Sequence, residues 1–287
     1  METLEFYSFQ NMENLFDYTS MQFDIVSHIL TLGFGCQAAG LVYFLSTAKD
    51  SSPKYRLSSW LSAVVMVSAA LILANQSIVW SNAFVWENGL WTLGESTFSN
   101  GYRYVNWSID VPMLLTQLLI VLGLTGASFR KNFVGFVVGG LLMIWTGYIG
   151  QFYEVVSLER LLLWGGVSTV FMIYICYIVG TSVFRNLKYQ PKETHGRFKA
   201  IFWVLIISWT LYPMAYLVPW FWDSAWGMVG RQIMFTTADI VSKVIYGVIL
   251  SQIVTIKSAK EGYVPAMKAL DYSEADRAQT KKDGVYI

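Results

Sequence analysis

The sequence predicts an all-α membrane protein. We expect a seven-transmembrane helix bundle with its N-terminus outside, its C-terminus in the cytoplasm, and a small extracellular β-hairpin between helices 2 and 3. Of the 287 residues, 55% are hydrophobic and only 14% are charged, whereas soluble proteins carry about 25% charged residues. Seven apolar stretches also come near the ~20 residues that cross a bilayer core. The placement of the basic residues agrees with that number of spans.

The apolar stretches give the transmembrane helices in order. We place the spans at 22–46, 57–81, 102–126, 132–152, 159–183, 200–222 and 229–256. Residues 1–21 form an N-terminal segment with acidic residues and no Lys or Arg, whereas basic residues gather in the first, third and fifth connections and after the last span. Because basic loops stay in the cytoplasm, residues 1–21 are predicted to be extracellular and residues 258–287 to form a cytoplasmic tail. Residues 22–257 are the seven-helix domain.

The connection between the second and third spans contains "AFVWENGLWTLG". An Asn-Gly pair between alternating apolar residues is the strongest short-range signal of a β-hairpin. We therefore expect the hairpin there.

Polar and ionisable residues interrupt two of the spans. The third span carries four of them, at spacings that place them on one helix face: Arg103, Asn106, Asp110 and Gln117. On the seventh span Asp239 and Lys243 are four residues apart and share a face. A charge near the bilayer centre costs roughly 2.5–3.5 kcal/mol, so these groups face the interior and mark a functional site. The alternative is that each only joins helices through a hydrogen bond or an ion pair.

A lysine in the middle of a span has a further use. Its amine can form a Schiff base with a carbonyl cofactor. Trp107, Trp209, Tyr212 and Pro213 could wall a pocket for a long apolar ligand, although aromatic residues in spans more often serve packing.

At these residues the sequence resembles the microbial rhodopsins. The similar motifs are "RYVNW…DVP" on the third span, "WTLYP" on the sixth and "DIVSK" on the seventh, and the resemblance runs from about residue 20 to 257. It implies that Lys243 carries all-trans retinal as a protonated Schiff base, so that 22–257 is a retinal-binding domain. It also implies the residues of the retinal pocket: Trp107, Val111, Met143, Gly147, Trp209, Tyr212 and Ser242. Gly147 would either seat the retinal ring or leave a gap for a carotenoid antenna.

Asn106, Asp110 and Gln117 resemble the motif of light-driven sodium pumps. The resemblance implies outward Na⁺ transport, with Asp110 as counterion and transient proton acceptor. Na⁺ would bind transiently near Asn106, Asp110 and Asp239, whose oxygens are hard ligands. Arg103 would block its return, and Gln117, an amide, cannot reprotonate the Schiff base from the cytoplasm. Protons would be pumped when sodium is absent.

Further residues resemble the ion pathway of that subgroup. They are Ser62, Ser68, Gln151 and Glu154, and we add Arg231 at the exit. At the cytoplasmic mouth the sequence departs from the subgroup, which has Asn and Gly where this chain has Ser59 and Ser251. These departures change the ligands for ion uptake and for selectivity against K⁺. Arg231 and Glu154 would form an ion pair, either at the ion exit or purely structural. His28 would lie at a subunit interface or be an ordinary buried histidine.

The resemblance also implies a multi-pass protein of the bacterial inner membrane. It would be a homo-oligomer, a pentamer, with Na⁺ or H⁺ and the lipid bilayer as partners and no nucleic acid. The competing functions are a dedicated outward proton pump, a photosensory rhodopsin and a retinal-free bundle. None of these is an enzyme.

Overall fold

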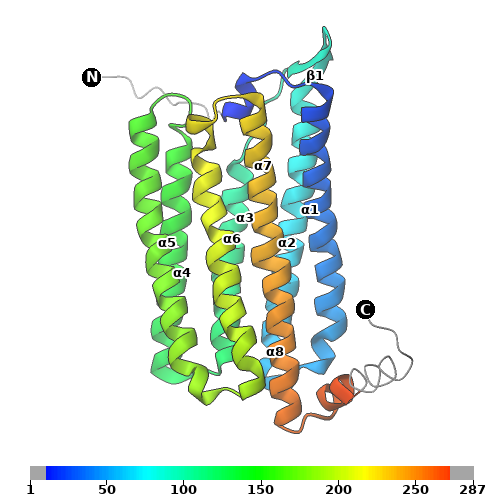
Figure 1. Cartoon of the computed structure of the whole chain (residues 1–287), viewed down its shortest axis with the longest axis vertical. Helices are drawn as coiled ribbons and strands as arrows, with labels where there is room; N and C mark the ends of the chain where they lie inside the picture. Colours follow the sequence, from blue (N-terminus) through cyan, green and yellow to red (C-terminus); the bar gives the residue numbers. More distant parts are fainter. Residues whose placement is uncertain (1–10, 272–287) are drawn as a thin grey trace.

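The computed structural model describes residues 11–271 and is a seven-helix bundle (Figure 1). The first six spans are α1 (Ser20–Thr47), α2 (Pro53–Ala83), α3 (Gly101–Leu122), α4 (Gly126–Gln151), α5 (Leu158–Asn186) and α6 (His195–Phe221). The seventh is one continuous run of α7 (Ala225–Asp239), the π-helix η5 (Ile240–Ile245) and α8 (Tyr246–Lys260). Short 3₁₀ helices are η1 (Met12–Leu15), η2 (Ala48–Asp50), η3 (Leu187–Tyr189) and η4 (Lys192–Thr194).

The predicted bundle of seven helices is thus confirmed for the described residues. The expectations for residues 1–10 of the N-terminal segment and 272–287 of the tail lie outside those residues. The sidedness of the bundle in the membrane stays a prediction. We therefore name its two ends by structure: the hairpin end, at the top of Figure 1, and the tail end, where α8 stops.

The predicted boundary between the third and fourth spans is wrong by several residues. The third span ends at Leu122 because Gly123 takes a left-handed conformation with φ 75°. The Leu124 N–H donates to the Leu119 carbonyl (3.1 Å) and the Gly123 N–H to that of Ile120 (2.9 Å). This Schellman motif closes the helix, so that α4 begins at Gly126.

The predicted hairpin is present. Strands β1 (Phe84–Glu87) and β2 (Leu90–Leu93) pair antiparallel. Between them Asn88 (φ 51°) and Gly89 (φ 87°) both have positive φ, as a type I′ turn requires. The Trp91 ring stacks on Phe23 of α1 with 3.9 Å between ring centroids, which holds the hairpin against the bundle.

Helix α3 lies in the middle of the bundle, behind α6 and α7 in Figure 1, and is the most buried of the spans. Helix α5 is the least buried. The functional polar residues of α3 are therefore buried against other helices, whereas most of α5 is exposed on the outside of the bundle. This placement makes α3 and the facing seventh span the scaffold of the functional site.

Candidate functional site

The amine of Lys243 stands at the centre of a buried charge cluster between α3 and the seventh span. Its Nζ donates to Asn106 Oδ1 and Asp239 Oδ1, each at 2.8 Å. It also forms an ion pair with Asp110 Oδ2 at 3.0 Å. The lysine sits in η5, where the helix widens; π-helical turns of this kind are frequent at functional sites. Arg103 is the second buried cation, so two cations face two carboxylates.

The two carboxylates differ sharply in their surroundings. Asp239 accepts from Arg103 Nη1 (3.0 Å), Trp107 Nε1 (3.1 Å) and Tyr212 Oη (2.8 Å) besides the lysine. Neither oxygen of Asp110 has a hydrogen-bond partner among the described residues, so its contact with Lys243 is one of charge. A carboxylate held by several donors stays ionised, whereas a buried one without them accepts a proton readily. The geometry therefore favours Asp110 as the proton acceptor.

A polar network continues from this cluster to the hairpin end. Arg103 Nη2 donates to Gln232 Oε1 (3.0 Å), and Gln232 Nε2 donates to Glu13 Oε1 (2.7 Å). Glu13 Oε2 pairs with Arg231 (3.1 Å), which also pairs with Glu154 (2.6 Å). The network is buried throughout, and it joins Lys243 to the N-terminal segment and the α4–α5 connection.

Toward the tail end the polar groups are neutral and sparse. Asn106 Nδ2 donates to Ser68 Oγ (2.8 Å), and Ser62 Oγ donates to Gln117 Oε1 (2.9 Å). Gln117 Nε2 has no partner among the described residues. Closer to the tail end, the Ser59 and Ser51 hydroxyls lie 3.1 Å apart, and Ser251 is also buried. In the described chain, all buried carboxylates lie at Lys243 or on its hairpin side: Glu13, Asp110, Glu154 and Asp239.

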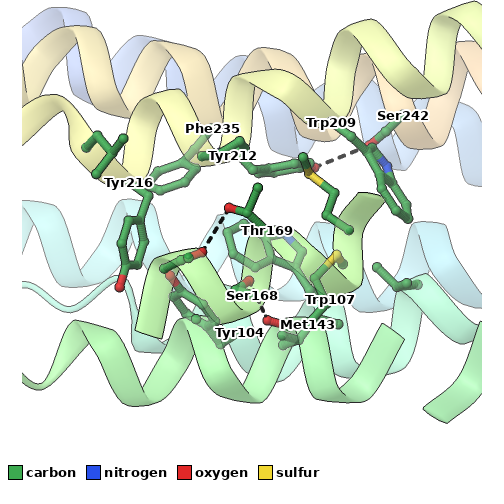
Figure 2. A pocket seen from close by; sticks show the side chains of 18 of the residues that line it. Tyr104, Trp107, Met143, Ser168, Thr169, Trp209, Tyr212, Tyr216, Phe235 and Ser242 are labelled. Carbon is green, nitrogen blue, oxygen red and sulfur yellow. Dashed lines mark hydrogen bonds between the residues drawn. The ribbon is translucent and has the colours of Figure 1, made fainter. Parts of the chain in front are cut away.

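A mostly apolar cavity of about 360 Å³ extends from Lys243 between α3, α4, α5 and α6. Figure 2 shows Trp107, Trp209 and Tyr212 around it, with the Tyr212 hydroxyl 3.3 Å from that of Ser242. A methyl group added at Gly147 would lie 3.3 Å from both Ser168 and Tyr104, so this wall is closely packed. The volume lies within the roughly 300–1,000 Å³ of ligand pockets.

The sequence-predicted residues come together in two groups. Those predicted for the retinal pocket all line the cavity: Trp107, Val111, Met143, Gly147, Trp209, Tyr212, Ser242 and Lys243. The expected pair of Arg231 and Glu154 is present, and Gln151 accepts from Arg231 at 3.1 Å. His28 is exposed on α1, so it is not an ordinary buried histidine.

Sequence reasoning missed part of the site. Phe235, Tyr104, Ser168 and Tyr216 also line the cavity. Gln232 stands seven residues before Asp239, on the same helix face, and that spacing could have revealed it. Glu13 lies in the short 3₁₀ helix η1 before α1, and no periodic pattern in the sequence signals its position.

Comparisons with known proteins agree with this geometry. Residues 24–257 match the family described as bacteriorhodopsin-like protein. The chain belongs to this family, the microbial rhodopsins.

Its relatives include bacteriorhodopsin-I of Haloarcula marismortui, 26% identical over 77% of this chain and 87% of the relative. Green-light absorbing proteorhodopsin of a gamma-proteobacterium is 22% identical over 85% of this chain and 89% of the relative. Among solved structures, xanthorhodopsin, a light-driven ion pump with dual chromophore, is 29% identical with a TM-score of 0.80, covering 86% of this chain and 98% of its own. A thermophilic rhodopsin is 28% identical with a TM-score of 0.81, covering 86% and 99%.

This rhodopsin is thus a multi-pass membrane protein of a family of light-driven ion pumps that bind retinal. The residues present fit that cofactor. The cavity is mostly apolar, Lys243 is among the residues that line it, and the Asp110 carboxylate lies 3.0 Å from the lysine amine, where it can balance a charge on that nitrogen.

Proposed function

We propose that this rhodopsin is a light-driven outward sodium pump with retinal attached to Lys243, and that it pumps protons when sodium is absent. The observation that carries the proposal is the one-sided placement of the buried carboxylates. They occur at Lys243 and toward the hairpin end, whereas the tail side offers the Gln117 amide and serine hydroxyls. A dedicated proton pump reloads the nitrogen from an acid on its uptake side, whereas this chain has the Gln117 amide there.

When bound, retinal supplies an imine at Lys243 Nζ and a light-driven isomerisation that moves this nitrogen. An imine nitrogen keeps at most one proton, whereas the lysine ammonium has three. With a single proton, the Lys243 nitrogen could donate to only one of the three groups that face it: Asn106, Asp110 and Asp239. Asp239 keeps three other donors, so Asp110 and Asn106 are the groups whose interactions change most.

Asp110 would hold the proton of the Lys243 nitrogen while a sodium ion passes. Two like charges 4 Å apart repel by about 4 kcal/mol at an effective permittivity of 20, so a cation cannot pass a charged nitrogen easily. Transfer of the proton to Asp110 neutralises both groups. Asn106 Oδ1 and the Asp239 carboxylate, which already face Lys243 Nζ at 2.8 Å, are then oxygen ligands for the ion.

The return of the proton from Asp110 would drive the ion outward. The positive charge on the Lys243 nitrogen reappears, and the ion moves toward Glu13 and Glu154 along the buried network. Arg103, which lies between the two carboxylate sites, opposes its return. Gln117 donates no proton from the tail side, so Asp110 both receives and returns the same proton.

The remaining features of this proposal follow the family. Residues 1–21 would face the outside and residues 258–287 the cytoplasm of a bacterial inner membrane, with 22–257 as the retinal-binding domain. The protein would assemble as a pentamer, with His28 on the exposed face of α1 at a subunit interface. Gly147 would seat the retinal ring.

The test is the light-induced pH change of cells that produce the chain with retinal, suspended in NaCl. A sodium pump makes the cell interior negative, protons leak inward, and the medium turns alkaline, more strongly with a protonophore. In a salt of a large organic cation the change should reverse to acidification. Acidification in both salts would contradict sodium transport and indicate a proton pump, and no change in either salt would indicate a sensor.

A matched variant makes the test residue-specific. Gln117→Glu supplies the missing acid on the tail side with little change of shape. We expect it to pump protons in NaCl as well, whereas Gln252→Glu, a change of the same type on α8, should behave as the parent.

A further inference from the structure

Lys257, on α8, is a second buried lysine, and the proposed function does not use it. Its residue is only 6% exposed. The amine donates to the Val121 carbonyl (2.6 Å) at the end of α3 and to Gln190 Oε1 (2.7 Å). It also lies 4.8 Å from the centroid of the Tyr55 ring. Three elements, α2, α3 and the α5–α6 connection, therefore meet at one cation.

This amine lies on the tail side of the polar groups that extend from Gln117 to Ser59. Tyr55 precedes Ser59 by four residues on α2, and Val121 follows Gln117 by four residues on α3. Four residues make about one helical turn, or ~6 Å, on the same face. Lys257 therefore lies between the same two helices, closer to the tail end than both Ser59 and Gln117.

The charge of Lys257 is stabilised without a carboxylate. Among the described residues no Asp or Glu forms an ion pair with it; Glu261, one turn further on, pairs with Lys54 and accepts from Tyr55. The amine instead faces the carbonyl end of α3, where the helix dipole favours a cation. Gln190 completes the arrangement by donating to the Leu122 carbonyl (3.0 Å). A positive charge without an ion-pair partner among the described residues thus lies on the tail side of Gln117.

We propose that Lys257 is an electrostatic valve at the tail end of the ion path: its positive charge raises the cation concentration at which the pump loads. This inference rests on the proposed function, because it takes the polar groups from Ser59 to Gln117 as the uptake route. A positive charge there opposes leakage of cations along the route in the resting state. It also makes uptake depend on displacement of the amine from Val121 and Gln190.

The experiment measures the initial rate of light-driven transport in oriented vesicles that contain the full chain with retinal, as a function of sodium on the uptake side. Lys257→Met keeps the length of the side chain and removes its charge. At an effective permittivity of about 20, a unit charge roughly 10 Å away changes an ion's affinity by on the order of tenfold. We therefore expect the half-saturating sodium concentration to fall about tenfold in Lys257→Met and to stay within about twofold in Lys257→Arg.

Two controls separate the valve from a structural role. Lys260→Met also removes a positive charge at this end, but Lys260 is half-exposed and screened by solvent, so it should leave the sodium dependence unchanged. If Lys257 had only a structural role, Lys257→Met would lower the melting temperature but leave the half-saturating sodium concentration as in the parent. That result would overturn the proposal. Lys257→Gln, which keeps a donor for Val121, serves if Lys257→Met does not fold.

The sodium dependence of transport by the parent chain tests the proposed function separately from the role of Lys257. If its transport does not depend on sodium, the sodium pump is wrong, and the same variants are then compared with the pH on the uptake side as the variable. An identical pH dependence of parent and Lys257→Met would overturn the valve as well. A shift in Lys257→Met alone would support it for protons.

Discussion

Two carboxylates at almost equal distances from one lysine have different chemistry in this rhodopsin. Asp239 and Asp110 lie 2.8 and 3.0 Å from Lys243 Nζ. Asp239 is also held by Arg103, Trp107 and Tyr212, whereas Asp110 has the lysine alone. The hydrogen bonds around each oxygen, and not the distance to the amine, therefore assign one group as a fixed charge and the other as an acceptor.

Asp110→Asn tests this assignment. The amide has the same shape but cannot receive a proton from the Lys243 nitrogen, and loss of a proton-transfer group typically lowers a rate 10²–10⁴-fold. We expect the variant to form a coloured pigment with retinal and to lose at least about 99% of light-driven transport, measured in cell suspension. Asp24→Asn, at an exposed position on α1, is the matched control. Transport by Asp110→Asn at the parent's rate would exclude Asp110 as the acceptor.

At the residue scale, helical periodicity in the sequence predicted which side chains lie on one helix face. Arg103, Asn106, Asp110 and Gln117 share a face because of their spacing, and all of them are buried as that spacing requires. Glu13 could not be predicted in the same way. It reaches Arg231 across 218 positions of the chain from a segment without regular spacing, so only the folded chain brings the two together.

At the scale of elements, hydropathy revealed each span, but local backbone chemistry decided where the spans end. The third span stops where Gly123 becomes left-handed, a choice that an average over ~20 residues does not resolve. The hairpin was predictable because Asn88 and Gly89 are the residues that its turn demands. The position of η1 at the hairpin end could not be predicted, because it depends on buried side-chain contacts of Asn11, Glu13 and Asn14.

Glu13→Gln tests whether that N-terminal segment stabilises the bundle. The variant would leave the buried Arg231 with Glu154 as its single carboxylate partner. A hydrogen bond to a charged group contributes about 1.5–3 kcal/mol to stability. We expect the melting temperature of the purified protein, followed by loss of its colour, to fall by roughly 4–8 °C. Asp17→Asn removes an exposed carboxylate of the same segment and should change it little; an equal effect of both variants would contradict a specific role of Glu13.

The whole molecule is electrostatically asymmetric along its axis. From Lys243 to the hairpin end, buried charges alternate in sign through Asp239, Arg103, Glu13, Arg231 and Glu154. Toward the tail end, neutral hydroxyls and amides lead to Lys257, which is the one buried cation on that side among residues 11–271. A cation near Lys243 is therefore attracted by carboxylates on the hairpin side and repelled by the charge of Lys257 on the tail side. In the proposed sodium pump, this asymmetry would set the direction of transport without requiring an acid on the uptake side.

The cavity at Lys243 links this transport machinery to the stability of the entire bundle. Its walls come from α3, α4, α5, α6 and the seventh span, so retinal bound there would contact all of these helices. Empty apolar space in a protein core costs about 24 cal/mol per Å³. For about 360 Å³ that rate sets an upper limit of about 9 kcal/mol, which partial closure of the helices would reduce.

Removal of retinal should therefore destabilise the whole molecule. We expect bleaching by hydroxylamine in the light to lower the melting temperature, followed by tryptophan fluorescence, by at least about 10 °C, because a ligand that binds the folded state alone adds its binding free energy to stability. Fresh retinal should restore both the colour and the melting temperature of the parent. Lys243→Ala cannot form the covalent bond, so retinal should give it no stable pigment. If the bleached and pigmented proteins melted at the same temperature, the cavity would not be the site at which retinal joins the helices.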